Sequence, residues 1–163
     1  DLHSFPTRRS SDLLSTGTYI GTPTNGKRIY TPPEGREIIL DHLSAWEKFL
    51  HGDHGVDPLV VMALAHYQFE AIHPFFDGNG RTGRILNLLT LIETGLLELP
   101  ILYLSGHIVR HKDEYYSLLN AVTRSDEWEP WILFMLTGIE STARWTLALV
   151  EATDGLRGTV EHR

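Results

Sequence analysis

The spacing of apolar residues along the chain changes near residue 34. Upstream, two β-rich segments, Thr18–Ile20 and Arg28–Thr31, flank the dipeptide Asn25-Gly26, which is typical of a tight hairpin turn. Pro32-Pro33 then ends the second segment, because proline cannot donate to a strand ladder. The pattern predicts an N-terminal β-hairpin, which needs a helical body to pack against.

From Glu34 onward the apolar residues recur at helical spacing. A first helix presents one apolar face and ends at "HGDHG", whose two histidines fit a solvated helix end better than a metal site. Asp57-Pro58 reads as the N-cap and first residue of a second helix, which runs to Ile72. That helix is apolar on nearly every side, so we expect it to be buried at the centre.

Three further helical stretches follow. One opens near Gly80 and stops at Gly95. Residues 105–122 predict a broken helix or two short ones, and residues 126–152 predict a long final helix. The expected fold is therefore mainly α, a single domain with a hairpin at its start.

Composition narrows the class of protein. The 163 residues are 42% hydrophobic and carry a net charge of −7, which argues against a nucleic-acid partner held by bulk electrostatics. Cysteine is absent, which fits a reducing compartment. With no apolar run long enough to span a membrane and no signal peptide, we expect a cytoplasmic protein.

The first 13 residues do not share the pattern of the rest. "DLHSFPTRRSSDL" has no helical or strand period, and it resembles a translated sequencing adapter along its whole length. We therefore leave residues 1–13 out of the fold prediction and expect that natural sequence before Leu14 is missing. The predicted domain covers residues 14–155, and residues 156–163 form a truncated tail.

Candidate chemistry gathers in "IHPFFDGNGRTGRIL", residues 72–86. Gly78, Asn79 and Gly80 lie between two predicted helices, where backbone N–H groups and the helix dipole favour an anion. Asn79 can add a side-chain donor. Arg81 and Arg84 are three residues apart on the first helical turns, which suits a polyphosphate.

Two more residues suggest a metal and a proton acceptor. Asp77 next to an anion site fits a Mg²⁺ held between a carboxylate and phosphates, or a simple helix cap. His73 can accept a proton from a hydroxyl near neutral pH. Phe75 and Phe76 are expected to anchor the loop on the core.

Two familiar nucleotide motifs do not apply. Residues 78–83 spell G-x-G-x-x-G, but the dinucleotide fingerprint requires a preceding strand and here a helix precedes. The Gly-Lys-Ser/Thr of a Walker loop is absent.

The stretch "HPFFDGNGRTGR" resembles the Fic family motif H-P-F-x-[DE]-G-N-G-R-x-x-R at every specified position. The likeness extends over about residues 17–152, including "LAHYQFEAIHPF", "LPILYLSGHI" and "WEPWILFML". Fic enzymes are mostly α-helical and typically transfer AMP from ATP to a Ser, Thr or Tyr hydroxyl of a protein.

The resemblance assigns roles by position. His73 would deprotonate the target hydroxyl, and Asp77 would hold Mg²⁺ against the α- and β-phosphates. Gly78, Asn79 and Gly80 would form the anion hole, with Asn79 near the α-phosphate. Arg81 would support the phosphates and Arg84 would bind the γ-phosphate. Tyr116 would border adenine.

The resemblance also concerns partners and regulation. The hairpin would be a flap whose edge, near Ile29, Tyr30 and Thr31, pairs with the target protein, and a homodimer is compatible with the family. Many Fic proteins carry an inhibitory [ST]-x-x-x-E-[GN] helix whose Glu pairs with the arginine at the position of Arg84. Here Glu129 follows Ser125 at that distance, but proline follows it. Such a helix, or a C-terminal winged helix, would lie outside this sequence.

Several alternatives remain at this stage. The same motif could use another nucleotide or phosphodiester donor, or remove AMP from a target. A non-catalytic ATP-binding regulator would need neither His73 nor Asp77. A metallohydrolase would use His66, His73 and Asp77, but His66 is better explained as a core residue.

Overall fold

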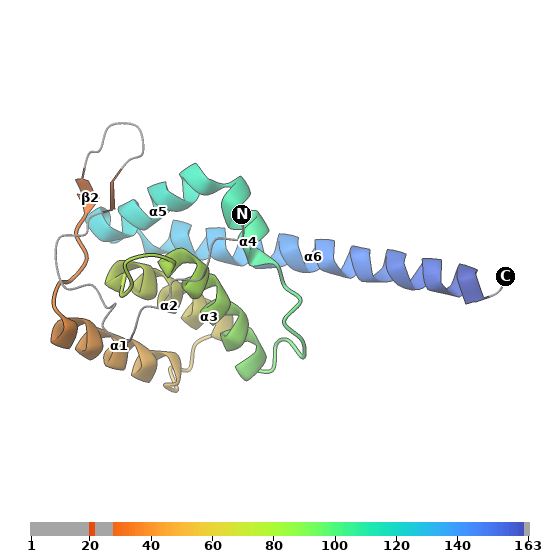
Figure 1. Cartoon of the computed structure of the whole chain (residues 1–163), viewed down its shortest axis with the longest axis horizontal. Coiled ribbons are helices and arrows are strands. Elements are labelled where there is room, and N and C mark those ends of the chain that lie inside the picture. The colour runs from red at the N-terminus through yellow and green to blue at the C-terminus, as the bar shows by residue number, and fades with distance from the viewer. Residues whose placement is uncertain (1–19, 22–27, 162–163) are drawn as a thin grey trace, which may run out of the picture. The chain divides into compact units, whose positions relative to one another are not determined.

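The computed structural model describes residues 20–21 and 28–161 of the chain. Most of these residues are helical, as the sequence predicts. The helices, labelled in Figure 1, are α1 (Arg36–Leu50), α2 (Pro58–Ile72), α3 (Asn79–Glu93), α4 (Leu104–Arg110), α5 (Lys112–Ser125) and α6 (Trp128–Glu161).

Two short strands precede the helices. β1 (Ile20–Gly21) pairs antiparallel with β2 (Arg28–Tyr30), with Ile20 opposite Tyr30 and Gly21 opposite Arg28. The predicted turn at Asn25-Gly26 lies outside the described residues, so the hairpin stays a prediction. The adapter-like residues 1–13 also lie outside the described part of the chain.

The helices divide between two compact units. Among the described residues, one unit comprises 20–21, 28–54 and 65–83, and the other comprises 55–64 and 84–161. Helices α2 and α3 each contribute residues to both units. The predicted domain boundaries stay a prediction.

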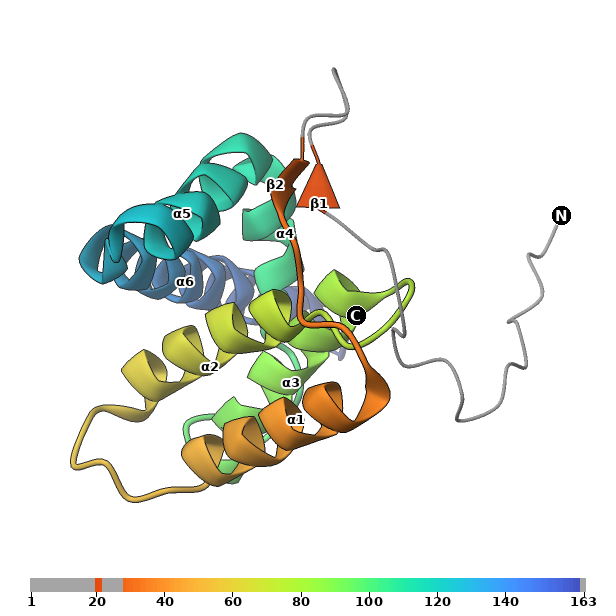
Figure 2. The same ribbon diagram turned by 90° about the vertical axis from the view of Figure 1, so that its left-hand side faces the viewer.

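In the first unit, α1 packs antiparallel along the second half of α2 (Figure 2). Ile39 at the start of α1 packs against Ile72 at the end of α2. Trp46, further along α1, donates a 2.8 Å hydrogen bond from Nε1 to the carbonyl of Ala65. The Trp46 ring also lies 5.7 Å from that of Phe69. These contacts fix the last turns of α2, which lead directly into His73 and the candidate site.

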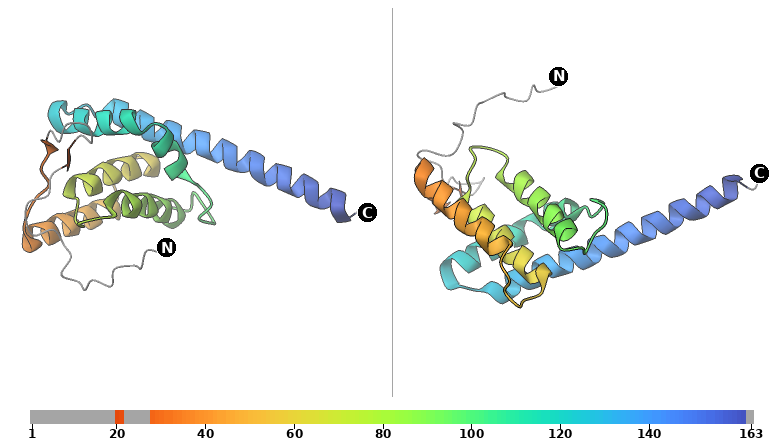
Figure 3. Two further views of the ribbon diagram at one scale, coloured as in Figure 1. Left: turned by 45° about the horizontal axis from the view of Figure 1, so that its top comes forward. Right: turned by 90° about the horizontal axis from the view of Figure 1, so that it is seen from below.

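In the second unit, α5 runs antiparallel to the first part of α6, and α6 continues well beyond it (Figure 3). The ring of Tyr115 on α5 lies 5.5 Å from that of Trp131 on α6. Trp131 also donates from Nε1 to the carbonyl of Ala63 at 2.9 Å, which joins α6 to the start of α2. The buried His107 ring of α4 lies 5.1 Å from Phe134, so α4 is anchored on the same helix.

The helix ends agree with the sequence in most places. Asp57 caps α2 through a 2.8 Å hydrogen bond from the Leu59 N–H to its Oδ1, as predicted. His54 lies at the end of α1, with Nε2 2.6 Å from the carbonyl of Phe49, in keeping with a helix-end role. The break between α4 and α5 at His111 confirms the prediction that this stretch is a broken helix or two separate short ones.

The predicted end of the last helix is wrong. Helix α6 continues past residue 152 to Glu161, through Gly155 and Gly158. Glycine lowers helix propensity by about 1 kcal/mol but, unlike proline, it keeps its N–H donor. Pro130 is accommodated because it lies in the first turn, where the missing N–H would have no partner in the helix.

No helix within residues 28–161 has the length and apolar character needed to cross a bilayer. The cytoplasmic location stays a prediction.

Candidate active site

His73 follows directly after the last residue of α2. Its backbone adopts the left-handed conformation, with φ 49°, which turns the chain away from the helix axis. Its N–H still bonds to the carbonyl of Phe69 at 3.0 Å. The side chain is half-buried, and its Nδ1 lies 3.3 Å from the carbonyl oxygen of Glu70.

The surroundings of His73 favour a neutral imidazole. Burial lowers its pKa below 6.5, and the hydrogen bond to Glu70 opposes this with a smaller effect. Because a carbonyl oxygen can only accept, Nδ1 carries the proton in that bond. Nε2 is then the nitrogen with the free lone pair, as a general base requires.

The loop that follows is held on the core by two residues. Pro74 is fully buried, and the ring of Phe75 lies 6.4 Å from that of Phe69 on α2. Phe76 is 81% exposed, so the expectation that it anchors the loop is wrong. The chain bends at Phe76, and of the two rings only that of Phe75 is placed against α2.

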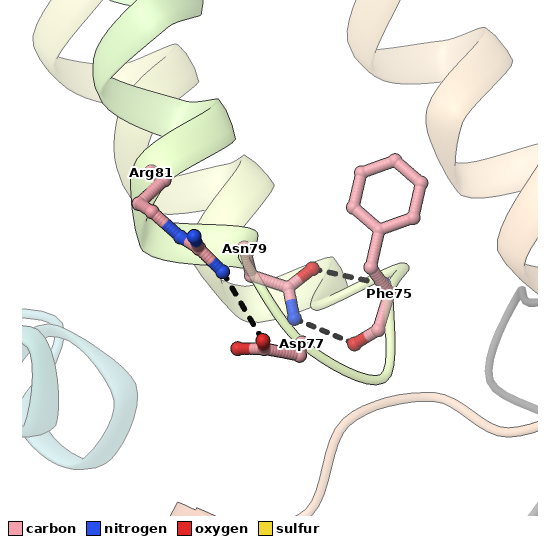
Figure 4. A network of polar contacts seen from close by, with 4 residues as sticks. All are labelled: Phe75, Asp77, Asn79 and Arg81. Atoms are coloured by element: carbon pink, nitrogen blue, oxygen red, sulfur yellow. Dashed lines mark hydrogen bonds and ion pairs between the residues drawn. The ribbon is translucent and has the colours of Figure 1, made fainter. Parts of the chain in front are cut away.

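Asn79 closes this loop, as Figure 4 shows. Its Oδ1 accepts from the Phe75 N–H at 2.8 Å, and its Nδ2 donates to the Phe75 carbonyl at 2.6 Å. The residue is only 3% exposed. The second hydrogen of Nδ2 is left for a ligand. The expected contact of Asn79 with a phosphate stays a prediction.

Gly78 and the start of α3 present backbone donors. Gly78 has φ 89°, a conformation that glycine adopts without strain and that turns the chain into α3. The Thr82 N–H already bonds to the Gly78 carbonyl at 2.9 Å. The N–H groups before Thr82, those of Asn79, Gly80 and Arg81, lie in the first turn of α3 and have no acceptor within the helix. Such a helix start favours an anion.

Asp77 and Arg81 form an ion pair at the edge of this loop. Arg81 Nη2 lies 3.1 Å from Asp77 Oδ2, and the two side chains are 71% and 85% exposed. Figure 4 shows the pair on the opposite side of the loop from the Phe75 ring. Asp77 makes no other hydrogen bond in the described part of the chain, so the alternative of a helix cap finds no support. An exposed pair of this kind is worth roughly 0–1 kcal/mol, so it can open for a ligand.

The donor set fits a magnesium ion. Asp77 offers a hard carboxylate oxygen beside a helix start that favours phosphate, and Mg²⁺ is commonly held by one carboxylate plus substrate phosphates. No three His, Cys, Asp or Glu side chains form a metal-binding group within the described ranges. A metallohydrolase using His66, His73 and Asp77 would require such a group.

His66 lies in the core, as its position on α2 suggested. It is 2% exposed, and together with the buried Glu70 it faces Gly83 on α3. A Cβ at Gly83 would lie 2.8 Å from Glu70 Oε1 and 3.1 Å from His66 Cε1. Glycine at this position therefore allows the first turns of α3 to approach α2, the helix that precedes His73.

Two of the expected site residues belong to the second unit. The half-buried Arg84 donates from Nε to Ser105 Oγ at 3.0 Å. Tyr116 on α5 is 48% exposed, with Lys112 Nζ 5.9 Å from its ring centre. The roles of both residues at the nucleotide stay predictions.

Tyr30 shows how the strand region is tied to the site. Its hydroxyl donates to the carbonyl of Ala71 at 2.9 Å, two residues before His73. Burial, with a smaller contribution from Tyr67, raises the pKa of Tyr30 and keeps this donor protonated. The tie joins residues far apart in the chain, so sequence spacing gave no signal for it.

Comparison with known proteins settles the family. The sequence profile of the Fic/DOC family matches residues 1–91, which include the loop and the start of α3. The chain belongs to the Fic/DOC family. The family motif spans His73 to Arg84, which comprises the loop after α2 and the first two turns of α3.

Several relatives of this Fic chain are known. It is 27% identical over 145 residues to a protein adenylyltransferase of Caenorhabditis briggsae, covering 88% of this chain and 26% of the relative. It is 32% identical over 121 residues to the protein adenylyltransferase Fic of Aedes aegypti, covering 72% and 22%. The chain thus spans about a quarter of the length of these curated relatives.

A solved structure agrees with the fold. The crystal structure of a Fic family protein from Desulfovibrio desulfuricans superposes with a TM-score of 0.65 at 28% sequence identity. The match covers 72% of this chain and 35% of that protein. The mainly helical Fic fold is therefore confirmed.

Proposed function

We propose that this Fic chain transfers AMP from ATP to a Ser, Thr or Tyr hydroxyl of a target protein. The observation that carries the proposal is the half-buried His73, whose lowered pKa and Nδ1 bond to Glu70 leave a neutral Nε2 beside a glycine-started helix. Relatives named protein adenylyltransferase support the same activity.

The proposed reaction is an in-line displacement at the α-phosphorus. Nε2 of His73 takes the proton of the target hydroxyl as its oxygen attacks the phosphorus. The bond from the α-phosphorus to the oxygen that bridges to the β-phosphate breaks, and pyrophosphate leaves. The products are the AMP ester of the target side chain and pyrophosphate, with the proton first held on His73.

The start of α3 stabilises the negative charge that develops. The N–H groups at Asn79, Gly80 and Arg81 are fixed before the substrate arrives, because Asn79 holds the loop through Phe75. Preorganised donors of this kind lower the barrier without the cost of reorganising solvent. Arg81 would support the phosphates, and Arg84 would bind the γ-phosphate.

Asp77 would hold the Mg²⁺ of the nucleotide. The ion neutralises phosphate charge and helps pyrophosphate to leave when bound. Asp77 must then exchange its contact with Arg81 for the metal, which frees the Arg81 guanidinium for a phosphate. This exchange is small in energy, because both side chains are exposed.

The target protein would lie along the strand region. β2 and the residue after it, Ile29 to Thr31, would offer a backbone edge to an extended segment of the target. The Tyr30 bond to Ala71 joins the end of this edge to the last turn of α2. A target strand paired with this edge would therefore lie on a segment that is bonded to α2 two residues before His73.

The test compares ATP labelled at the α-phosphate with ATP labelled at the γ-phosphate. The chain is incubated with each, with Mg²⁺ and a cell lysate, and the labelled proteins are separated. We expect label on protein from the α position only, and competition by unlabelled ATP. Label from the γ position would indicate phosphoryl transfer, and stronger competition by GTP, CTP or UTP would indicate a different nucleotide donor. Absence of label from either would contradict a transferase.

A further inference from the structure

Arg84 forms a hydrogen bond with Ser105, a residue that lies outside the family motif. Arg84 lies in the second turn of α3, and Ser105 is the second residue of α4. Arg84 Nε donates to Ser105 Oγ at 3.0 Å, and both side chains are half-buried. We propose that Ser105 is a positioning residue that orients the Arg84 guanidinium for the terminal phosphate of the nucleotide.

The bond engages one edge of the guanidinium and leaves the other. Arginine has five N–H donors in a rigid fork, and Ser105 takes the one on Nε. Arg84 has no other hydrogen bond or ion pair within the described residues. Its Nη1 and Nη2 hydrogens therefore remain for a ligand, in the geometry that suits two phosphate oxygens.

A hydroxyl orients Arg84 without cancelling its charge. Arg81, by comparison, is paired with the carboxylate of Asp77, which competes with any anion for that guanidinium. Ser105 offers only a neutral oxygen, so Arg84 keeps its full positive charge. The bond also restricts a long side chain before binding, which lowers the entropy lost when phosphate is bound.

Ser105 is itself held in place by its neighbours on α4. Leu104 is buried, and its Cδ1 would lie 3.1 Å from a Cβ at Gly138 of α6. His107 is buried against Phe134 of the same helix. Residues on either side of Ser105 are thus packed against α6, so Ser105 lies on a rigid part of the chain, as a positioning residue requires.

The inference rests on the proposed function, because that function places Arg84 at the γ-phosphate. Its test is nucleotide binding, which does not depend on transfer. Isothermal titration calorimetry of the full chain would use ATP and ADP, each with Mg²⁺, and four proteins: wild type, Ser105→Ala, Ser105→Thr and Arg84→Ala. Ser117→Ala, an exposed serine on α5, is the matched control.

We expect Ser105→Ala to weaken ATP binding about threefold to tenfold, because the variant loses one hydrogen bond to a cation that remains partly solvated. Binding of ADP, which lacks the γ-phosphate, should be unchanged. Ser105→Thr keeps the hydroxyl and should restore most of the ATP affinity, while Ser117→Ala should match wild type. Thermal melting confirms that the variants fold.

A double variant separates positioning from other effects. In the Arg84→Ala background, Ser105→Ala should weaken ATP binding no further, because its only action is through Arg84. An equal loss in both backgrounds, or an equal loss for ADP, would overturn the proposal. So would normal ATP binding by Ser105→Ala when Arg84→Ala binds weakly. If Arg84→Ala binds ATP normally, the γ-phosphate role of Arg84 in the proposed function is wrong and Ser105 has nothing to position.

Discussion

Burial and one backbone hydrogen bond act on the imidazole of His73 in opposite directions. Burial lowers its pKa and has the larger effect, while the carbonyl of Glu70 raises the pKa by stabilising the proton on Nδ1. The result is a ring that is neutral near pH 7 and that has a defined tautomer. A base needs both properties, and the bond that fixes the tautomer comes from Glu70 in the last turn of α2.

The pKa of His73 in the folded chain should therefore lie below 6.5. NMR titration of the imidazole in the free protein, assigned by comparison with His73→Ala, measures it. The unfolded chain takes up this proton more readily, so stability should fall as pH decreases from about 6.5 towards the folded pKa. A midpoint at or above 6.5 would show that burial does not dominate at this residue.

Asn79 contributes to the site first as a structural clamp. Asn79→Ala should remove both bonds to Phe75 and leave two backbone groups of the loop without partners. We expect a loss of about 1–3 kcal/mol in the free energy of unfolding, measured by urea denaturation.

Asn79→Asp is the matched control for the clamp. It keeps an oxygen for the Phe75 N–H but loses the donor to the Phe75 carbonyl. A smaller loss than for alanine is expected. Unchanged stability in Asn79→Ala would mean that the loop does not depend on this residue.

At the level of elements, the site depends on where α2 ends and α3 begins. Sequence alone predicted both helices, because α2 has an Asp57-Pro58 start and an apolar surface on nearly every side, and α3 begins within Gly78-Asn79-Gly80. These signals are local, so they can be recognised without the fold. The motif residues from His73 to Arg84 can also be recognised from the sequence alone, because they lie in one continuous stretch.

The connections between elements could not be predicted in this way. The hydrogen bonds from Tyr30 to Ala71 and from Arg84 to Ser105 join residues that are distant in sequence. The spacing of apolar residues therefore does not indicate them. Asn79 and Phe76 show a second limit. The sequence gives their residue types, but the direction of each side chain is set by the turn of the loop.

Tyr30→Phe tests the tie between β2 and α2. The substitution removes the hydroxyl bond to Ala71 and keeps the ring. We expect a loss of about 0.5–1.5 kcal/mol in stability and faster amide hydrogen exchange at residues 28–30.

Tyr103→Phe, at an exposed tyrosine before α4, is the control for Tyr30→Phe and should leave both quantities unchanged. If exchange at residues 28–30 is the same in Tyr30→Phe and wild type, the hydroxyl does not hold the strand on α2.

On the scale of the whole molecule, the chain combines a Fic fold with the loop to which we assign the proposed AMP transfer. The family profile covers residues 1–91, a range that includes the proposed base His73, Asp77, Asn79 and both motif arginines. Since the chain spans about a quarter of the curated relatives, its activity has to be measured on this chain itself.

Mass spectrometry of proteins modified by wild type and by His73→Ala tests whether this chain transfers AMP and whether His73 is the base. Each protein is incubated with ATP, Mg²⁺ and lysate, and peptides are searched for added AMP. We predict AMP on Ser, Thr or Tyr with wild type, and a loss of about 10²–10⁴-fold with His73→Ala, although ATP binding is retained. Equal modification by His73→Ala would contradict the role of His73 as the base, and folded, ATP-bound wild type that adds no AMP would contradict the proposed transfer.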